Sequence, residues 1–219
     1  MSERPGVQPD SGVGEVHGPA TTNSYPADLE CDVITSSGLT LRLRPIQPKD
    51  AEGLIRFHNK LSSDSVYRRY FSMHPELSAP EVDHLTTVDY TDRLAFVVED
   101  RDEMVAVGRY DRQPNTPTAE VAFLVSDHYQ QHGIGQLLLE HLADAAWERG
   151  ITEFCAETQA DNRGMMRVFR ESGFDVTSSL EDGVISVRFP IEPTETSEAR
   201  RAERRTRALL NVSTLTRRG

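Results

Sequence analysis

The sequence predicts an α+β fold in which helices flank a mixed central β-sheet. Runs of residues with the two-residue period of strands alternate with runs that have helical spacing. Three strand-like runs succeed one another without an intervening helix between residues 94 and 125, which favours an antiparallel meander over a doubly wound parallel sheet. The 219 residues suffice for one medium domain with tails, and no internal repeat divides them.

The first predicted elements come after a long polar segment. Residues 1–38 are rich in glycine, proline, serine and aspartate, which predicts a disordered leader. Alternating apolar and polar residues over 39–44 then predict a strand with one face in water. A helix is expected from Asp50, because the next apolar residues recur on one stripe. Two more short helices are predicted over 63–71 and after Ser78, which opens a capping box.

The middle of the chain predicts a buried sheet. Residues 94–98 and 104–109 predict two strands around a polar turn, and the apolar run of residues 121–125 predicts a third. Beyond this run, helices and strands alternate to the end of the domain. These later predicted elements are a helix from Gly135 to a glycine cap at Gly150, a strand over 151–158, a helix from Asn162 to Gly173 and a strand over 183–189.

The end of the chain differs in charge from the rest. Residues 191–219 are basic and rich in helix formers, which predicts a tail that is either helical or disordered. The folded domain is therefore expected to span residues 39–190. The formal net charge is −11, so an acidic body argues against a nucleic-acid partner and suits a cationic substrate.

Composition also bounds the cellular setting. No apolar run approaches the roughly 20 residues that span a membrane, and the first residues lack the apolar core of a signal peptide. Two cysteines predict no disulfide. We therefore expect a cytoplasmic protein without membrane contact, present as a monomer or homodimer.

The loop from Gln130 to Gly135 predicts a pyrophosphate site. Its two glycines allow the backbone to approach a phosphate closely, and it leads into a helix whose free N–H groups and dipole attract the same anion. Spacing excludes two common alternatives. A dinucleotide fold requires a third glycine where Leu138 stands, and a P-loop requires lysine where Gln136 stands.

This loop and a later helix resemble the motifs of a known family. Gln-x-x-Gly-x-Gly between a strand and a helix, and Asn162 opening a short helix that ends at Gly173-Phe174, are similar to motifs of the GNAT N-acetyltransferases. The resemblance extends over residues 39–189. It implies the GNAT fold, acetyl-CoA as the co-substrate and an amine as the acceptor.

A narrower resemblance points to the acceptor and to a catalytic residue. Glu120 with the apolar run after it, Asn162-Arg-Gly-Met165 and Tyr67-Arg-Arg-Tyr-Phe71 resemble the bacterial Pat-type protein lysine acetyltransferase domains. This implies a protein lysine as acceptor and Glu120 as general base, which removes a proton from the attacking amine. The apolar neighbours predict a desolvated carboxylate, a better proton acceptor than a hydrated one. From composition alone, the alternative is a solvated glutamate at a strand end.

The family resemblance also assigns the coenzyme contacts. Asn162 is expected to bond to the pantetheine arm, to cap its helix, or both. The other predicted contacts are the backbone of Phe123, Leu124 and Val125 for the pantetheine arm and the amides of Gln130, Gln131, His132, Gly133, Ile134, Gly135 and Gln136 for the pyrophosphate.

Two further observations leave alternatives open. Many GNAT enzymes carry a tyrosine that protonates the leaving thiolate at the position of Phe169, which cannot donate a proton. This departure keeps a non-catalytic acyl-CoA-binding sensor open beside a small-molecule amine acetyltransferase. His128 and His132 are four residues apart, but the segment lacks the glutamate of a zinc protease motif, so no metal site is predicted.

Overall fold

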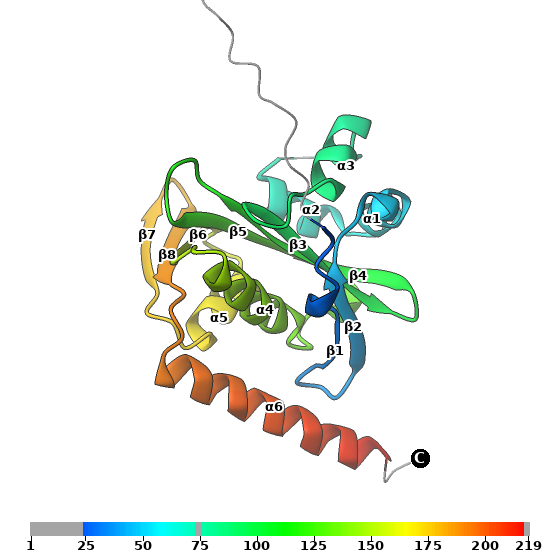
Figure 1. Cartoon of the computed structure of the whole chain (residues 1–219), viewed down its shortest axis with the longest axis vertical. Helices are drawn as coiled ribbons and strands as arrows, with labels where there is room; N and C mark the ends of the chain where they lie inside the picture. Colours follow the sequence, from blue (N-terminus) through cyan, green and yellow to red (C-terminus); the bar gives the residue numbers. More distant parts are fainter. Residues whose placement is uncertain (1–23, 73–75, 217–219) are drawn as a thin grey trace, which may run out of the picture.

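The computed structural model describes residues 24–72 and 76–216, and in this part of the chain one eight-stranded sheet runs through the molecule (Figure 1). The strand order is β1-β2-β3-β4-β5-β6-β8-β7. The strands are β1 (Cys31–Ile34), β2 (Thr40–Pro45), β3 (Arg93–Asp100), β4 (Glu103–Arg112), β5 (Thr118–Val125), β6 (Glu153–Gln159), β7 (Thr177–Glu181) and β8 (Val184–Pro190).

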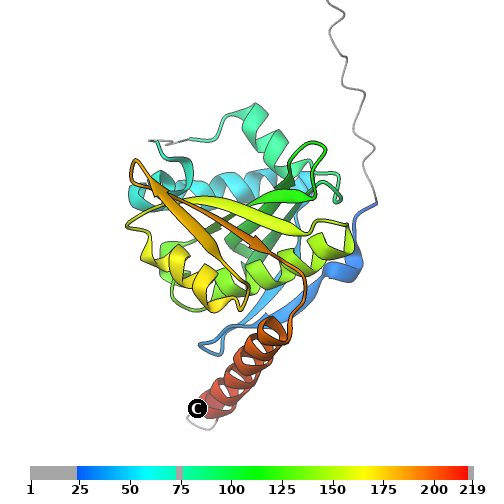
Figure 2. The same cartoon turned by 90° about the vertical axis from the view of Figure 1, so that its left-hand side faces the viewer.

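Helices cover both faces of the sheet and form two outer layers (Figures 1 and 2). The first three helices lie on one face, and α4 and α5 lie on the other. The helices are α1 (Ala51–Asn59), α2 (Ser63–Tyr70), α3 (Ala79–Thr86), α4 (Ile134–Glu148), α5 (Arg163–Glu171) and α6 (Glu195–Thr216). The predicted α+β architecture with a mixed central sheet and flanking helices is confirmed.

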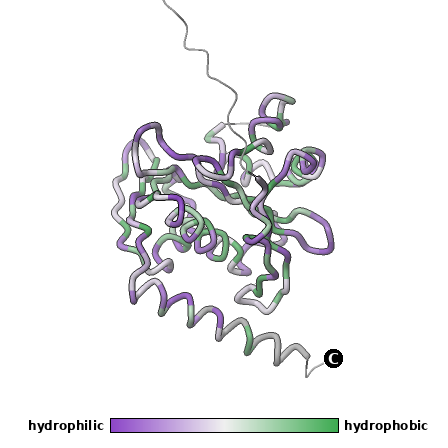
Figure 3. The backbone as a smooth tube through the Cα atoms, in the orientation of Figure 1, coloured by the Kyte–Doolittle hydropathy of each residue, from purple (hydrophilic) through white to green (hydrophobic). Residues whose placement is uncertain are grey.

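The core lies between the central strands and α4. Leu138, Leu139 and Leu142 of α4 are fully buried, and hydrophobic residues concentrate in the same region, whereas the first turns of α6 are hydrophilic (Figure 3). Gly108 of β4 permits this close packing. A Cβ atom at Gly108 would lie 3.1 Å from the Phe123 ring and 3.2 Å from Leu138.

The strand β1 lies in the segment predicted as a disordered leader, so the prediction for residues 1–38 was wrong at this strand. It pairs antiparallel with β2, with Cys31 opposite Leu43, and Val33 is buried against the core. The polar residues around β1 hide its alternation, because only one of its side chains is fully buried. Residues 1–23 lie outside the described part of the chain.

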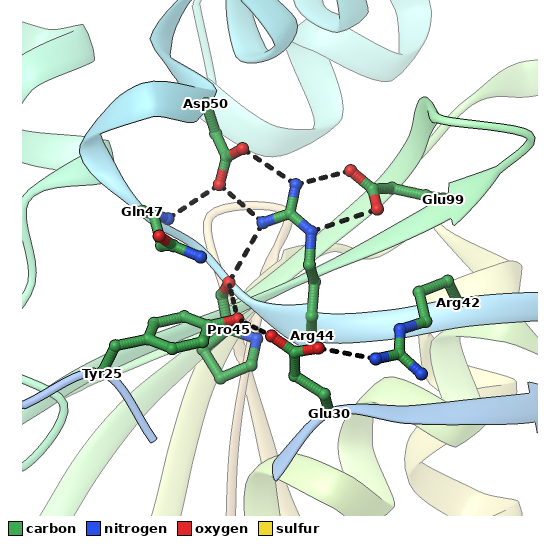
Figure 4. Close-up of polar contacts among 8 residues, drawn as sticks. All are labelled: Tyr25, Glu30, Arg42, Arg44, Pro45, Gln47, Asp50 and Glu99. Atoms are coloured by element: carbon green, nitrogen blue, oxygen red, sulfur yellow. Dashed lines mark hydrogen bonds and ion pairs between the residues drawn. The ribbon is translucent and has the colours of Figure 1, made fainter. Parts of the chain in front are cut away.

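A charged network fixes the N-terminal strands to the first helix (Figure 4). Arg44 of β2 donates to both oxygens of Asp50, at 2.8 Å each, and to both oxygens of Glu99 on β3, at 3.1 and 2.5 Å. The hydrogen bonds to Asp50, and then those to Glu99, outweigh burial and raise the pKa of the Arg44 guanidinium above its ordinary value. Beside it, the Tyr25 hydroxyl donates to Glu30 at 2.6 Å. Arg44 thereby joins β3, where its partner Glu99 lies 55 residues further along the chain, to β2 and the start of α1.

The predicted tail contains a long helix that packs on the domain through its first turns. Ser197 is buried beside Gly173, where a Cβ atom would lie only 2.8 Å from the Ser197 Cα atom. One turn further, Arg201 of α6 forms an ion pair of 2.7 Å with Asp144 of α4. No helix in residues 24–72 and 76–216 combines the length and apolar character that crossing a bilayer requires.

Candidate functional site

The sheet opens at the point where β5 and β6 separate. These two strands are the parallel neighbours of the sheet, and their pairing covers only Thr118 to Glu120 of β5. Beyond Glu120 the strands part, and a pocket of about 780 Å³ lies there between β5, β6, α2, α5 and the N-terminus of α4. Parted parallel strands leave backbone groups of β5 without a partner strand, so an extended ligand can bond to them as a strand would.

The pocket gathers nearly all of the residues that the sequence assigns to the site. His132 is the exception, because it does not line the pocket. The residues that do line it are Glu120, Phe123, Leu124, Val125, Gln130, Gln131, Gly133, Ile134, Gly135, Gln136 and Asn162.

The loop before α4 has main-chain amides that no acceptor in the described part of the protein engages. Among the described residues, no acceptor bonds to the backbone N–H groups of residues 131–136, whereas Leu137 already bonds to the Gly133 carbonyl at 3.2 Å. The first turn of α4 contains no acidic residue that would compete for these amides. Six unengaged amides at the N-terminus of a 15-residue helix form an anion site. The pocket therefore fits a coenzyme that carries a pyrophosphate.

The turn between β1 and β2 braces this loop. Gly133 has φ +88°, and a Cβ atom there would lie 2.6 Å from the Ser36 hydroxyl oxygen. That hydroxyl donates to the His132 carbonyl at 3.0 Å, and the His132 ring bonds to the Ser37 hydroxyl at 2.8 Å. The His132 side chain thus helps to hold the loop against the turn between β1 and β2. No sequence pattern indicated Ser36, because this residue lies in the segment predicted as disordered.

A second group of contacts fixes the loop to α2. The side-chain NH₂ group of Gln130 donates to the Ser65 hydroxyl at 3.1 Å and to the Val125 carbonyl at 3.3 Å. Asp127 accepts hydrogen bonds from Ser62 and Ser65 at 2.7 to 2.9 Å. Partial burial acts to raise the pKa of Asp127, but these hydrogen bonds outweigh it and lower the pKa below its ordinary value.

Glu120 stands at the point of separation, the last residue of β5 that pairs with β6. Its side chain is exposed, so the desolvated carboxylate expected from the apolar neighbours was wrong. Strand alternation explains the difference: Val121 and Phe123 are buried on one face, whereas Glu120 points to the other. On β6, the exposed Glu157 lines the same pocket.

Asn162 caps α5 from the wall of the pocket. Its Oδ1 atom accepts a hydrogen bond of 3.1 Å from the Met165 amide, so the capping role is confirmed. The side-chain NH₂ group of Asn162 is not used by this cap, which leaves a donor beside the pocket. The two roles expected for this residue are therefore compatible.

Neither Phe169 nor Tyr129 offers a free phenol to the pocket. Phe169 is 1% exposed and packs on Phe189 at a ring distance of 5.6 Å. Tyr129 lines the pocket, but its hydroxyl donates to Asp100 at 2.7 Å, and this hydrogen bond raises the pKa of Tyr129. Proton transfer to the thiolate through Tyr129 would require the loss of that bond.

Several lining residues were not among the predicted site residues. The Thr158 hydroxyl of β6 is buried without a hydrogen-bond partner in the described residues. From α2 the pocket is lined by Arg69 and Tyr70, with the Arg69 guanidinium 5.2 Å from the centre of the Tyr70 ring. Burial raises the pKa of Tyr70. In the described part of the chain, no group of three or more histidine, cysteine or acidic residues is placed to hold a metal ion.

The chain matches a known family and known proteins. A model of the acetyltransferase (GNAT) family matches residues 63–174. Acetyltransferase Pat of Mycolicibacterium smegmatis is 32% identical over 157 residues, which cover 70% of this chain and 46% of Pat. Acetyltransferase PA5475 of Pseudomonas aeruginosa is 30% identical over 141 residues, covering 63% of this chain and 76% of that protein.

A solved structure is also similar. The GNAT domain of S. lividans PAT superimposes with a TM-score of 0.72 at 41% identity, covering 76% of this chain and 99% of that domain. The chain therefore corresponds to a whole GNAT domain but spans about half the length of the mycobacterial relative.

Proposed function

The chain belongs to the acetyltransferase (GNAT) family and is related to the Pat acetyltransferases, and from this we propose that it transfers an acetyl group from acetyl-CoA to the side-chain amine of a protein lysine. Enzymes of this family use acetyl-CoA. In the proposal, the pocket between β5 and β6 holds the coenzyme, and Glu120 accepts the proton of the amine that attacks.

One observation carries the proposal. The six successive backbone amides of residues 131–136 bond to no acceptor among the described residues, and all of these residues except His132 line the pocket that begins where β5 and β6 part. A diphosphate that binds these amides would place its attached arm along the free edge of β5. The backbone of Phe123, Leu124 and Val125 lines that stretch, and the Asn162 amide donor faces it from α5. The activated acyl group would then lie near Glu120.

Glu120 has the position and the charge of a proton acceptor. A lysine ammonium has a reference pKa of about 10.4 and must lose a proton before its nitrogen can attack a thioester carbonyl. Glu120 lies on the pocket wall at the separation point, exposed to an incoming amine. In the proposed step Glu120 takes one proton from the ammonium, and the neutral amine nitrogen then forms the new bond to the acyl carbon. The bond from carbon to sulfur breaks with its electron pair on the leaving thiolate, and the second proton of the nitrogen passes through water to that thiolate.

The openness of the site beside Glu120 supports a protein acceptor. Glu120 on β5 and Glu157 on β6 both line the pocket and are both exposed. This face leaves room for an extended protein segment, whereas a small amine would favour an enclosed cavity. The net charge of −11 attracts a cationic lysine over a distance limited by salt screening.

Two measurements test this function. Calorimetry with acetyl-CoA should detect binding, and its absence would contradict the coenzyme pocket. Replacement of Glu120 by Gln should lower kcat by roughly 10² to 10⁴, the usual contribution of a general base, with the acetyl-CoA affinity unchanged. Glu181→Gln, a charge change at an exposed position of β7, is the matched control. If Glu120→Gln keeps full turnover, Glu120 is not the base.

The acceptor requires its own experiment. Cell lysate proteins incubated with labelled acetyl-CoA and the purified chain should gain labelled lysines that mass spectrometry can locate. Free polyamines and amino acids should be poorer acceptors under the same conditions. Equal turnover on these small amines would remove the preference for protein lysine, and binding without any turnover would indicate a sensor.

A further inference from the structure

A second groove, of about 510 Å³, lies along the outer side of α5. Three arginines of α5 line it, Arg163, Arg167 and Arg170. The other lining residues are the acidic Glu171 and the apolar Ala160, Met166 and Ile185. Arg167 also lines the larger pocket between β5 and β6. The groove and the pocket therefore meet at this residue.

The arginines of this groove differ from most other arginines in the described part of the chain. Their spacing of four and three residues places them on one side of α5, and all three are exposed. Within residues 24–72 and 76–216 no carboxylate forms an ion pair with any of the three, although the chain has 35 acidic and 24 basic residues. By contrast, Arg44 and Arg201 bond to carboxylates. Like charges one turn apart oppose helix formation, and a bound anion would relieve this repulsion.

The position of α5 relates these arginines to the amide loop. A Cβ atom at Gly135 would lie 3.1 Å from Val168, so the first turn of α4 is in contact with α5 at the residue next to Arg167. A group that extends from a diphosphate on the loop by the length of one sugar can therefore reach the Arg167 side chain. The guanidinium is planar and suited to bind a phosphate with two parallel hydrogen bonds.

We propose that Arg167, in the positive field of Arg163 and Arg170, binds the phosphomonoester at the ribose 3′ position of the coenzyme. This inference rests on the proposed function, because it requires the pyrophosphate to occupy the amides of residues 131–136. It assigns the α5 groove a role in selecting the phosphorylated coenzyme over a form that lacks this phosphate. Acyl chemistry at Glu120 does not involve the groove.

Calorimetry can isolate the contact with two ligands and three proteins. The ligands are acetyl-CoA and its 3′-dephospho form, and the proteins are the wild type, Arg167→Gln and Arg56→Gln. Arg56 is the matched control because its side chain is 68% exposed on α1, so its loss changes the net charge equally at a remote position. The wild type and the control should bind the dephospho form roughly tenfold more weakly than acetyl-CoA, as expected for a charge-assisted hydrogen bond.

The diagnostic result is the loss of this difference in one variant. Arg167→Gln should bind acetyl-CoA roughly tenfold more weakly than the wild type does and should bind both ligands with equal affinity. An unchanged difference in Arg167→Gln, or equal binding of both ligands by the wild type, would overturn the inference. Wild-type protein that binds neither ligand would contradict the proposed function itself, which separates the two failures.

Discussion

Gly133 has the least freedom to change among the residues of the loop. Its φ of +88° is a left-handed conformation that other residues adopt only with strain, and the Ser36 hydroxyl occupies the space where a side chain would begin. We expect Gly133→Val to displace the turn of Ser36 and to disorder the amides of residues 131–136. The acetyl-CoA dissociation constant should rise roughly tenfold or more, which calorimetry can measure.

The chain offers a matched control for backbone strain. Gly150, at the end of α4, has φ +75°, and a Cβ atom there would have no neighbour within 4 Å. Gly150→Val should therefore lower the free energy of unfolding through strain alone and leave the coenzyme affinity intact. If both variants bind acetyl-CoA as the wild type does, the amides of the loop do not form the pyrophosphate site.

At the scale of elements, the Arg44 network determines how β2, β3 and the start of α1 meet. Arg44 is 14% exposed in its side chain and bonds to Asp50 and Glu99, which are 7% and 16% exposed. Arg44→Leu would leave both carboxylates partly buried without their cation. The free energy of unfolding should fall by about 3–5 kcal/mol, which urea denaturation can measure.

A neighbouring arginine provides the comparison. Arg42 on the same strand pairs with Glu30 and Asp32, but its side chain is 43% exposed. Water can solvate Glu30 and Asp32 when the arginine is removed, so Arg42→Leu should lower the free energy of unfolding far less than Arg44→Leu does. Equal losses for Arg42→Leu and Arg44→Leu would show that burial does not control the energy of this network.

The elements that the sequence missed have a common physical character. Every residue of β7 is exposed, and β1 buries one side chain completely. Such edge strands depend on hydrogen bonds to a neighbouring strand, and their side chains leave no apolar period in the sequence. The strands β3, β4 and β5 were predicted because their buried residues form apolar runs. The helix start at Ser78 was predicted because the capping box is local, and Ser78 bonds to Glu81 as expected.

At the scale of the whole molecule, the layers meet at His141 of α4. This ring contacts Phe96 of β3, with ring centres 6.2 Å apart, and lies near Asp144, Arg201 and Arg205. Burial lowers the pKa of His141, the two arginines of α6 lower it further, and Asp144 opposes them. Protonation is therefore more costly in the folded protein than in the unfolded chain.

Because the pKa of His141 is lower in the folded protein than in the unfolded chain, the free energy of unfolding depends on pH. The stabilisation from neutral His141 is complete above the unfolded pKa of about 6.5 and is lost as the pH falls from there toward the lower pKa of the folded state. Urea denaturation at several pH values should show this decline, and it should be smaller in His141→Gln. The exposed His128 provides the control variant His128→Gln. A decline of the same size in the wild type and in His141→Gln would contradict the assignment.

The extent of the folded unit also belongs to this scale. We propose that the unit is larger than the predicted domain of residues 39–190. Before it, β1 joins the sheet and its turn braces the amide loop through Ser36. After it, α6 packs against Gly173 and binds Asp144 through Arg201. Polar composition in both segments concealed these contacts, since each depends on a few residues.

The sequence by itself determined the order of the core elements, the loop with its two glycines and the family that these motifs identify. These features are local, because periodicity, capping and glycine spacing depend on residues that are close along the chain. Only the tertiary structure decided that Glu120 is exposed, that His132 contacts the turn of Ser36 and Ser37, and that α5 contacts the loop through Val168 at Gly135. These three features depend on contacts between segments that are far apart in the sequence. Only tertiary packing brings such segments together.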